Sequence, residues 1–451
     1  MRTSSEKEEQ WSRLMLEVEI DRYIQQITNL PRQADRPEDV VGQLLGRATQ
    51  VGMNSVATFG YADDRPRNLY ETLFQCCLDP AYHRYFQSHP WLCSQILRGR
   101  ALALIVGGKF NDSLESAEIL ISSKQYFHDE YRIETVLMLG LYLQGIAAMH
   151  RGRLIESSLR FKEAIDCYER LSESWDTGVL VLAQLCDKYG MDIPTATLVY
   201  GALCLQLLGK LGEALDWNEK AWNRATGLNH PFTLAFCITF RAMFYKLRGA
   251  DRLAHKLATI GKTISTQYDF AFYSAYATFL QGASQAAQGL YRDGIKGMNR
   301  GIELAESTGS TIFHHLFDAY LMEAYQESEM SSAALERINN ALHKAQSCYP
   351  EEQLYRGELL RIKGDILWHF CPEKANEAEW YLGEAFRVAD KQQALSQQLR
   401  AARDLSELWV QQGQRTKARD LLGSVVKLFP DDGCDDLNLK KAKRLLQRRI
   451  T

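Results

Sequence analysis

The sequence predicts an all-α fold in which helix-turn-helix units stack side by side into a superhelical solenoid. Three observations support this prediction. Glycines and small residues recur at a fixed spacing, and apolar residues recur at helical spacing on both sides of each glycine. The chain has only 10 prolines in 451 residues, and long segments rich in Ala, Leu, Gln, Glu, Lys and Arg leave little room for strands.

The repeat register is clearest in the middle of the chain. Gly249 and Gly289 lie 40 residues apart (289 − 249), each between two amphipathic segments. Small residues recur at the same interval, first as Ala254, Gly294 and Ala334, then as Gly261, Gly301 and Ala341. A glycine suits a tight turn after a helix, and small residues allow two helices to cross closely. The unit is therefore a helix pair joined by a short turn.

The same unit continues outward with less regular spacing. Further turns are predicted at Gly152, Gly209 and Gly413, and a less regular unit around Gly364 carries about two extra residues near Pro372. We count about eight units between residues 90 and 428. A single unit cannot bury its apolar face alone, so neighbours stack, and the first helices line a concave surface available for binding.

The two ends of the chain do not follow this register. Residues 1–89 look helical at 8–27 and then carry Pro31, Pro37 and a turn-rich stretch, so we expect a helical N-terminal cap or small domain. Residues 429–451 begin with an acidic loop and end in a basic segment, which we expect to form a C-terminal capping helix. The solenoid itself is predicted at 90–428.

Charge and apolar patterning set expectations for partners and compartment. The balance of 53 basic and 56 acidic residues gives a formal charge of −3, so nucleic acid is not the expected partner. No signal-peptide pattern and no run of about eighteen apolar residues is found, so we expect a cytoplasmic protein without a membrane partner. Cysteines such as Cys93, Cys167, Cys204 and Cys237 lie singly in apolar helical patterns, which favours reduced, buried thiols.

Several segments resemble the tetratricopeptide tails of large bacterial signal-transducing ATPases of the STAND type, including those fused to adenylate cyclase or winged-helix domains. The matching segments are residues 192–209, 230–236, 355–364, 399–409 and 436–446. The resemblance implies a tetratricopeptide-like, right-handed solenoid that acts as a sensor or protein-interaction arm. The nucleotide-binding and cyclase modules of those proteins are missing here. No catalytic residue can therefore be carried over from them.

Motifs for nucleotide or metal binding are weak. Gly261-Lys262-Thr263 has the end of a phosphate loop, but position 256 is a lysine instead of the required glycine, and the segment lies within a second helix. His314-His315 and Cys76-Cys77 are adjacent pairs, which project about 100° apart on a helix and so chelate one ion poorly. We expect core or surface roles for both pairs, and neither a metal nor a cofactor.

Catalytic motifs are also missing. The sequence contains no Gly-x-Ser-x-Gly and no His-Glu-x-x-His pattern, and carboxylates such as Glu358 and Asp365 fit an ordinary solvated helix face. We therefore expect a non-enzymatic protein. An enzyme whose pocket is assembled inside the superhelix from distant residues is kept as an alternative.

A second alternative is a DNA-binding regulator. Residues 48–58, with Gly52, have the spacing of a helix-turn-helix, and Arg65 and Arg67 follow. The segment itself lacks basic residues where a recognition helix needs them. An ordinary helical turn is the favoured interpretation.

The leading hypothesis is a bacterial cytoplasmic scaffold that captures a protein segment, peptide or effector in its concave groove. Offsets before each turn glycine select the predicted groove residues: Tyr142, His150, Thr239, Lys246, Tyr276, Phe279, Gln326, Arg361, Arg400, Arg403 and Glu407. Aromatics in the middle suit apolar side chains, and arginines toward the end suit carboxylates. This pattern predicts an extended peptide with an acidic terminus. A homo-oligomer is also compatible with the sequence.

Overall fold

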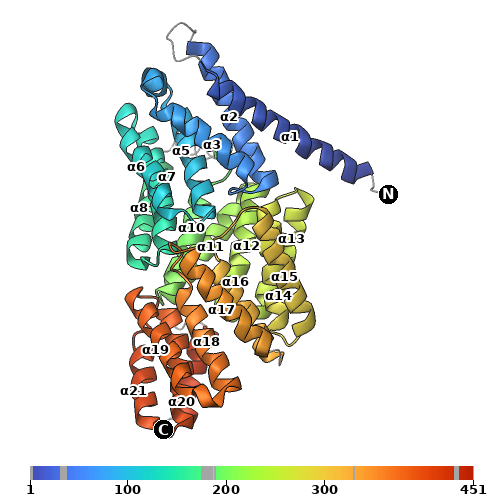
Figure 1. The fold of residues 1–451 in the computed structure, drawn as a ribbon. Helices are drawn as coiled ribbons and strands as arrows, with labels where there is room; N and C mark the ends of the chain where they lie inside the picture. The colour runs from blue at the N-terminus through green and yellow to red at the C-terminus, as the bar shows by residue number, and fades with distance from the viewer. Residues whose placement is uncertain are drawn as a thin grey trace.

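The protein is described by a computed structural model, which covers residues 4–30, 38–173, 186, 189–328, 331–430 and 436–449. Every regular element within these residues is a helix, and none is a strand. The helices pack in consecutive antiparallel pairs along the chain (Figure 1). The predicted all-α, tetratricopeptide-like solenoid is thus confirmed.

Four helices and a short 3-10 turn precede the repeats. They are α1 (Ser4–Thr28), α2 (Glu38–Phe59), α3 (Asp64–Leu78), η1 (Pro80–Tyr82) and α4 (His83–Ser88). Eight helix pairs follow within the described residues: α5 (Pro90–Val106) with α6 (Phe110–Ser122), α7 (Glu130–His150) with α8 (Leu154–Glu173), α10 (Ile193–Leu207) with α11 (Leu211–Gly227), α12 (Pro231–Leu247) with α13 (Asp251–Gln267), α14 (Ala271–Ala286) with α15 (Tyr291–Ser307), α16 (His314–Glu327) with α17 (Ser331–Ser347), α18 (Arg356–Phe370) with α19 (Ala375–Lys391), and α20 (Leu395–Gln411) with α21 (Arg415–Val426). Short 3-10 turns η2 (Ser123–Tyr126) and η3 (Pro372–Lys374) lie between helices, and α22 (Leu437–Arg449) comes last.

The predicted turn glycines have the left-handed backbone that a tight helix-helix turn requires. Their φ angles are +73° at Gly152, +77° at Gly209, +75° at Gly249, +87° at Gly289 and +80° at Gly413. In the turn after α12, the amide of Ala250 donates to the carbonyl of Tyr245 at 2.9 Å, which closes the helix end. Because L-residues with a Cβ are strained at such φ angles, glycine marks each of these turns.

Small residues mark the helix crossings, as the sequence predicted. A Cβ added at Gly301 would lie 2.6 Å from the backbone of Phe279, and one added at Gly294 would lie 2.6 Å from the amide of Ala286. The backbones of α14 and α15 therefore touch where these glycines lie. Ala254 and Ala334 are fully buried at the equivalent positions of neighbouring pairs.

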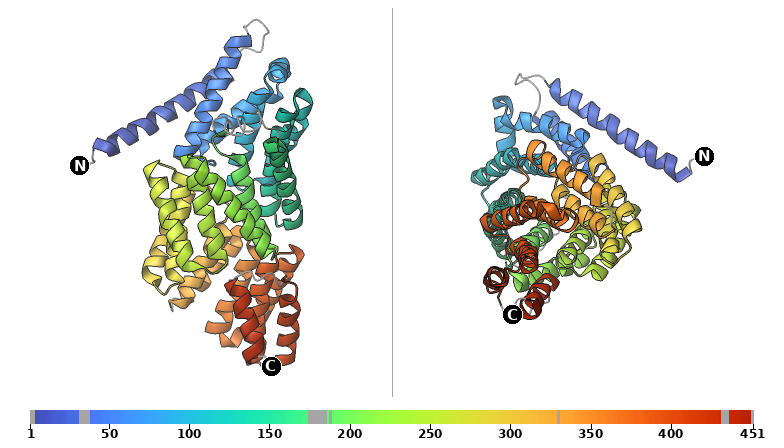
Figure 2. Two further views of the ribbon diagram at one scale, coloured as in Figure 1. Left: turned by 180° about the vertical axis from the view of Figure 1, so that it is seen from behind. Right: turned by 60° about the horizontal axis from the view of Figure 1, so that its bottom comes forward.

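The solenoid winds tightly enough for late repeats to contact early ones. The first helices of successive pairs, α10, α12, α14, α16, α18 and α20, contact one another in order. The pairs α18 to α21 then lie against the end of α7 and α8, as the two opposite views agree (Figures 1 and 2). Backbone amides of Gln353 and Leu354 donate to the carbonyl of His150 at 2.8 and 3.1 Å. The segment between α17 and α18 consequently covers the C-terminal end of α7 on the inner wall of the spiral.

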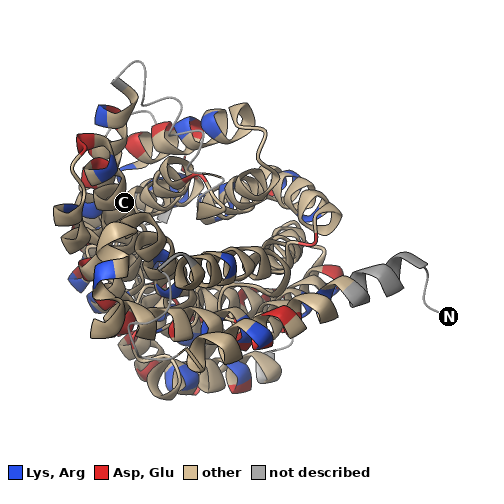
Figure 3. Cartoon of the chain, turned by 90° about the horizontal axis from the view of Figure 1, so that it is seen from above, with Lys and Arg blue, Asp and Glu red and all other residues tan. Residues whose placement is uncertain are grey.

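The N-terminal helices do not contain the helix-turn-helix that the DNA-binding alternative requires. Helix α2 runs without a break through Gly52, where a Cβ would lie 3.1 Å from the ring of Tyr70. Gly52 thus allows helix packing within a continuous helix, so the structure does not support the alternative of a helix-turn-helix at residues 48–58, which the sequence did not favour. Basic and acidic residues are interspersed along the helices, with α1 projecting from one side (Figure 3). The boundaries of an N-terminal cap at residue 89 and of a C-terminal cap at residue 429 stay predictions.

Among the described helices, α7 is long and apolar enough to cross a membrane by length and composition. Its most apolar window is 78% buried inside the protein. Packing between neighbouring helix pairs accounts for this apolar character.

Candidate ligand-binding cleft

The inner face of the solenoid holds a polar cleft of about 420 Å³, here called the inner cleft. It lies where the ends of α12 and α14 meet α16, α18, α20 and α22. Its charged and polar side chains are Lys246, Asp251, Tyr291, Tyr320, Glu323, Gln326, Glu327, Arg361, Asp365, Arg400, Arg403, Asn438 and Lys441. This volume lies in the range of small-ligand sites.

Five predicted groove residues meet in the inner cleft. They are Lys246, Gln326, Arg361, Arg400 and Arg403, which come from four different first helices. The offset rule places them together because first helices stack with their equivalent positions side by side.

Arg361 lies at the centre of an ion-pair network that joins three helices. Its side chain contacts Glu323 on α16, Glu358 on its own helix α18, and Asp404 on α20. The Nε–Glu358 distance is 2.9 Å, and the Nη1–Asp404 distance is 2.6 Å. Arg361 is only 2% exposed. A planar guanidinium suits this role because it donates in several fixed directions.

Arg400 and Arg403 share the same carboxylates. Arg400 contacts Glu323 at 2.5 Å and Glu358 at 3.4 Å, and Arg403 contacts Asp404 at 2.6 Å. The Nε of Arg400 is buried without a hydrogen-bond partner. The hydroxyl of Tyr320, which also lines the cleft, is likewise buried without a partner, so two buried donors of the cleft have no partner among the described residues.

The remaining polar groups pair along the wall of the cleft. Lys246 Nζ contacts Asp251 at 2.6 Å and lies 4.7 Å from the ring centroid of Tyr320. Gln326 Nε2 donates to Asp365 at 2.8 Å. These contacts hold the cleft side chains in defined positions without any ligand.

Burial and pairing oppose each other in setting the pKa values. Burial alone raises the pKa of Asp404, but the guanidiniums of Arg403 and Arg361 outweigh it and lower the pKa to about 2. Burial likewise raises the pKa of Glu323, while Arg400, Arg361 and Lys246 bring it below its ordinary value. Both carboxylates are therefore ionised at neutral pH.

Lys441 of α22 is the exception to this pairing. Burial lowers its pKa, and the nearby guanidiniums of Arg403 and Arg400 lower it further, against the weaker effect of Asp251 and Glu323. No carboxylate of the described residues lies within ion-pair distance of it. Lys441 and the two arginines thus leave a net attraction for an incoming anion at this end of the cleft.

The other predicted groove residues lie elsewhere. Tyr142, Tyr276 and Phe279 are buried in the aromatic core, where Phe279 stacks on Phe317 with ring centroids 3.8 Å apart. The Tyr276 hydroxyl donates to the carbonyl of Ile312 at 2.7 Å. The prediction that these three aromatics line an open groove is wrong, because the next repeats of the tightly wound spiral pack against them.

His150 and Thr239 are also fully buried. His150 Nδ1 lies 2.9 Å from a carboxylate oxygen of Glu352, and its ring stacks on Phe110. Thr239 faces Gly261 at a helix crossing. Neither side chain has surface for a ligand. Glu407 is half-buried on α20, one turn beyond Arg403, whose pKa its charge helps to raise.

Sequence reasoning missed the carboxylates of the cleft. Glu323 and Asp404 are placed by contacts between helices, which no local pattern reports. One local signal was present for Glu358, since it precedes Arg361 by three residues and so shares its helix face. Lys441 reaches the cleft because α22 folds back onto α12, where Asn438 donates to the carbonyl of Leu247 at 3.2 Å.

Comparisons with known proteins address the fold. No protein-family model matches the sequence, and no curated protein matches it in a sequence search. Among solved structures, the chain is similar to a Rap protein complexed with Competence and Sporulation Factor, with a TM-score of 0.58, 13% identity, and coverage of 92% of this chain and 100% of that chain.

Two further solved structures are less similar to the chain. The apo form of RapI gives a TM-score of 0.43 at 12% identity, covering 69% of this chain and 99% of that one. A STAND protein with a tetratricopeptide repeat sensor from Pyrococcus horikoshii gives 0.39 at 13% identity, covering 92% of this chain and 66% of that one. At 13% identity, the similarity to the Rap protein supports the all-α, tetratricopeptide-like solenoid fold and nothing finer.

Proposed function

We propose that the chain is a non-enzymatic scaffold or sensor arm that captures a protein segment, peptide or effector in the inner cleft. The observation that carries this proposal is Lys441, which has no ion pair to a described residue and lies in the cleft beside the paired side chains of Arg400 and Arg403. An entering carboxylate would pair with Lys441 and offset its repulsion from the two neighbouring guanidiniums.

The ligand chemistry follows from this arrangement. A peptide C-terminus or an acidic side chain supplies such a carboxylate. The cleft walls at Lys246, Gln326 and Asp365 offer further polar contacts to the rest of the peptide. The network around Arg361 holds the donors in place before binding, which lowers the entropic cost of capture. Regulation of a signalling or transcription complex would follow from occupancy of the cleft.

The similarities support this role without specifying it. The Rap protein to which the fold is similar was solved in complex with Competence and Sporulation Factor. The sequence resemblance to the tails of bacterial signal-transducing ATPases supports the role of a sensor arm. With that resemblance we also propose a bacterial, cytoplasmic protein.

The test uses a library of fluorescent peptides with acidic C-termini, titrated against the full chain by fluorescence polarisation. Each peptide is paired with its C-terminally amidated form. Loss of a charged hydrogen bond costs about 1.5–3 kcal/mol, so Lys441→Ala is expected to weaken binding about tenfold or more.

Lys443→Ala is the matched control, because Lys443 is exposed on the same helix and does not line the cleft. It should leave the affinity within about twofold, a range that corresponds to a few tenths of a kcal/mol. Equal affinity of the two lysine variants, or of free and amidated peptides, would count against the proposal.

A further inference from the structure

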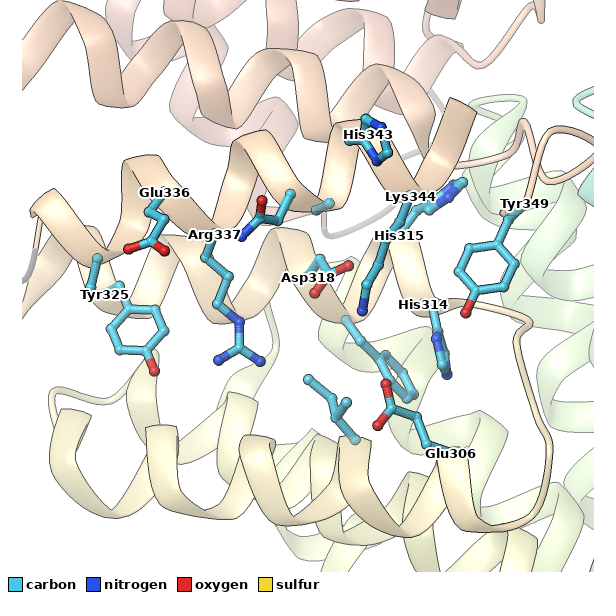
Figure 4. A pocket seen from close by; sticks show the side chains of 15 residues that line it. Glu306, His314, His315, Asp318, Tyr325, Glu336, Arg337, His343, Lys344 and Tyr349 are labelled. Atoms are coloured by element: carbon cyan, nitrogen blue, oxygen red, sulfur yellow. The ribbon is translucent and has the colours of Figure 1, made fainter. Parts of the chain in front are cut away.

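A second cavity, here called the outer pocket, lies between the second helices α15 and α17 and has the first helix α16 as its floor (Figure 4). Its volume is about 570 Å³. Charged and imidazole side chains that line it include Glu306, His314, His315, Asp318, Arg337 and Lys344. The outer pocket and the inner cleft have no lining residue in common.

The linker before α16 determines which residues form the floor. Phe313 precedes the helix with a left-handed φ of +61°, and its ring is buried between His150 and Tyr276. This anchor fixes the start of α16, so that His314 lies in the first turn and Asp318 one turn later. Residues four apart share a helix face, and both side chains therefore face the outer pocket.

Several polar groups of the floor have no partner among the residues that the structure describes. His314 and His315 are 8% and 2% exposed, and His314 Nε2 and both ring nitrogens of His315 lack a hydrogen-bond partner. The half-buried carboxylate of Asp318 has no hydrogen bond or ion pair to any described residue. Buried polar groups without partners are costly, and such a cluster needs an explanation.

The charges of the outer pocket come from all three helices that enclose it. Burial raises the pKa of Asp318 to about 6, opposed by Arg337 and Lys344 and reinforced by Glu306. Burial lowers the pKa of His314 to about 4, with smaller effects from His315 and Lys344, and burial also lowers that of His315. At neutral pH the floor therefore offers a carboxylate and two neutral imidazoles.

Figure 4 shows acceptors and donors facing one space. Asp318 and the guanidinium of Arg337 face the space between α15 and α17, and His314 lies one helical turn before Asp318, beside Glu306. Neither Arg337 nor Lys344 forms an ion pair with a residue in the described part of the chain. Donors from α17 and acceptors from α16 are thus both available to one ligand.

Simple ions do not fit this set of groups. A lone anion would meet Asp318 and Glu306, and a lone organic cation would meet Arg337 and Lys344. For a metal ion, the adjacent histidines project about 100° apart, and among the described residues no group of three His, Cys, Asp or Glu side chains is placed to hold one. A ligand carrying both charges avoids each of these conflicts.

We propose that the outer pocket binds a small zwitterion of the amino-acid class, with its ammonium group on Asp318 and His314 and its carboxylate on Arg337 and Lys344. The neutral imidazole accepts a hydrogen bond from the ammonium group, and the guanidinium donates to the carboxylate. Ile302 and Phe317 supply an apolar wall for the ligand's side chain. The site is independent of the proposed capture of a peptide in the inner cleft.

The test is a thermal-shift screen of the full chain against the standard amino acids at millimolar concentration, followed by titration calorimetry on the best one. That amino acid is compared with its N-acetyl derivative, which lacks the ammonium group, and with its decarboxylated amine. We expect the free amino acid to bind at least about tenfold more tightly than either analogue. Binding should weaken as the pH falls through about 6, where Asp318 becomes protonated.

Asp318→Asn is the matching variant, and it should weaken binding by about tenfold or more because a neutral amide no longer attracts the ammonium group. Glu336→Gln, at the exposed rim of the same pocket, should leave binding within about twofold. Retained helical circular dichroism shows that each variant is folded. The proposal is overturned if no amino acid stabilises the chain, if the N-acetyl derivative binds equally well, or if Asp318→Asn binds like the parent.

Discussion

The inner cleft and the outer pocket use the same residue types in opposite ways. In the inner cleft, Arg361 contacts carboxylates from three helices, and each of those carboxylates contacts a further arginine. In the outer pocket, Asp318 and Arg337 face one cavity without pairing. The first arrangement joins repeats to one another, and the second leaves charges free for a ligand.

This difference has a cause in the packing of the spiral. Inner positions of α16, α18 and α20 stack side by side, so charges on them meet within hydrogen-bond distance and are buried together. The outer helices α15 and α17 are separated by the width of α16, which leaves a cavity between their facing side chains. The inner network therefore joins the repeats and fixes the walls of the inner cleft, whereas the outer pocket keeps Asp318 and Arg337 unpaired among the described residues.

The largest expected effect comes from removing the centre of the network. Arg361→Ala leaves Glu323, Glu358 and Asp404 buried with fewer cations. Breaking a buried ion pair lowers the free energy of unfolding by about 3–5 kcal/mol. We expect a loss of about 3 kcal/mol here, because Arg400 and Arg403 still contact these carboxylates. The measurement is the urea midpoint followed by helical circular dichroism at pH 7.5.

Arg337→Ala is the matched control in the outer pocket. It removes a half-buried arginine that has no ion pair, so the expected change is within about 0.5 kcal/mol. Similar losses for the two variants would mean that pairing does not distinguish the two sites.

A smaller effect is expected from acid. The pKa of Asp404 is about 2 in the folded protein against an ordinary value of 3.8, so the unfolded chain takes up a proton first as the pH falls. Its stabilising contribution is present above about pH 4 and is lost as the pH falls toward 2, by about 2 kcal/mol. Urea midpoints measured between pH 5 and about pH 2 check this.

Asp404→Asn provides the comparison for the acid titration. Its stability should be lower at pH 7 and should change less between pH 4 and 2, since the titrating group is gone. An unchanged pH dependence in this variant would assign the acid sensitivity to other carboxylates.

Local rules explain how much the sequence could predict. The turn glycines Gly249 and Gly289 and the crossing glycines Gly294 and Gly301 were recognisable because their requirement is set within one helix pair. The same repeat offsets placed Arg361 in the cleft, since equivalent positions of stacked helices align. Fold class and part of the site were therefore predictable.

Non-local packing explains what the sequence could not predict. Tyr276 and His150 occupy inner positions by their offsets, but residues of later repeats cover them, including Phe313 and Glu352. The tightness of the winding decides this, and it depends on contacts between segments far apart in the chain. Gly52 shows the same limit, because a glycine for close packing and a glycine for a turn look alike in sequence.

The smallest expected effect has the opposite sign and concerns the outer pocket. The pKa of Asp318 is raised from 3.8 to about 6, so burial disfavours its ionised form, and stability is lost as the pH rises from about 4 through 6. The full pKa shift would correspond to about 3 kcal/mol, but solvent screens the half-buried carboxylate. Asp318→Asn removes this cost and should raise the stability by about 1–2 kcal/mol at pH 7.5, with the gain vanishing near pH 4. Glu336→Gln, on an exposed carboxylate of the same pocket, should change it by only a few tenths of a kcal/mol. A loss of stability in Asp318→Asn would mean that other groups of the protein already stabilise the carboxylate. A gain in stability together with weaker amino-acid binding would mean that the unpaired carboxylate serves ligand binding.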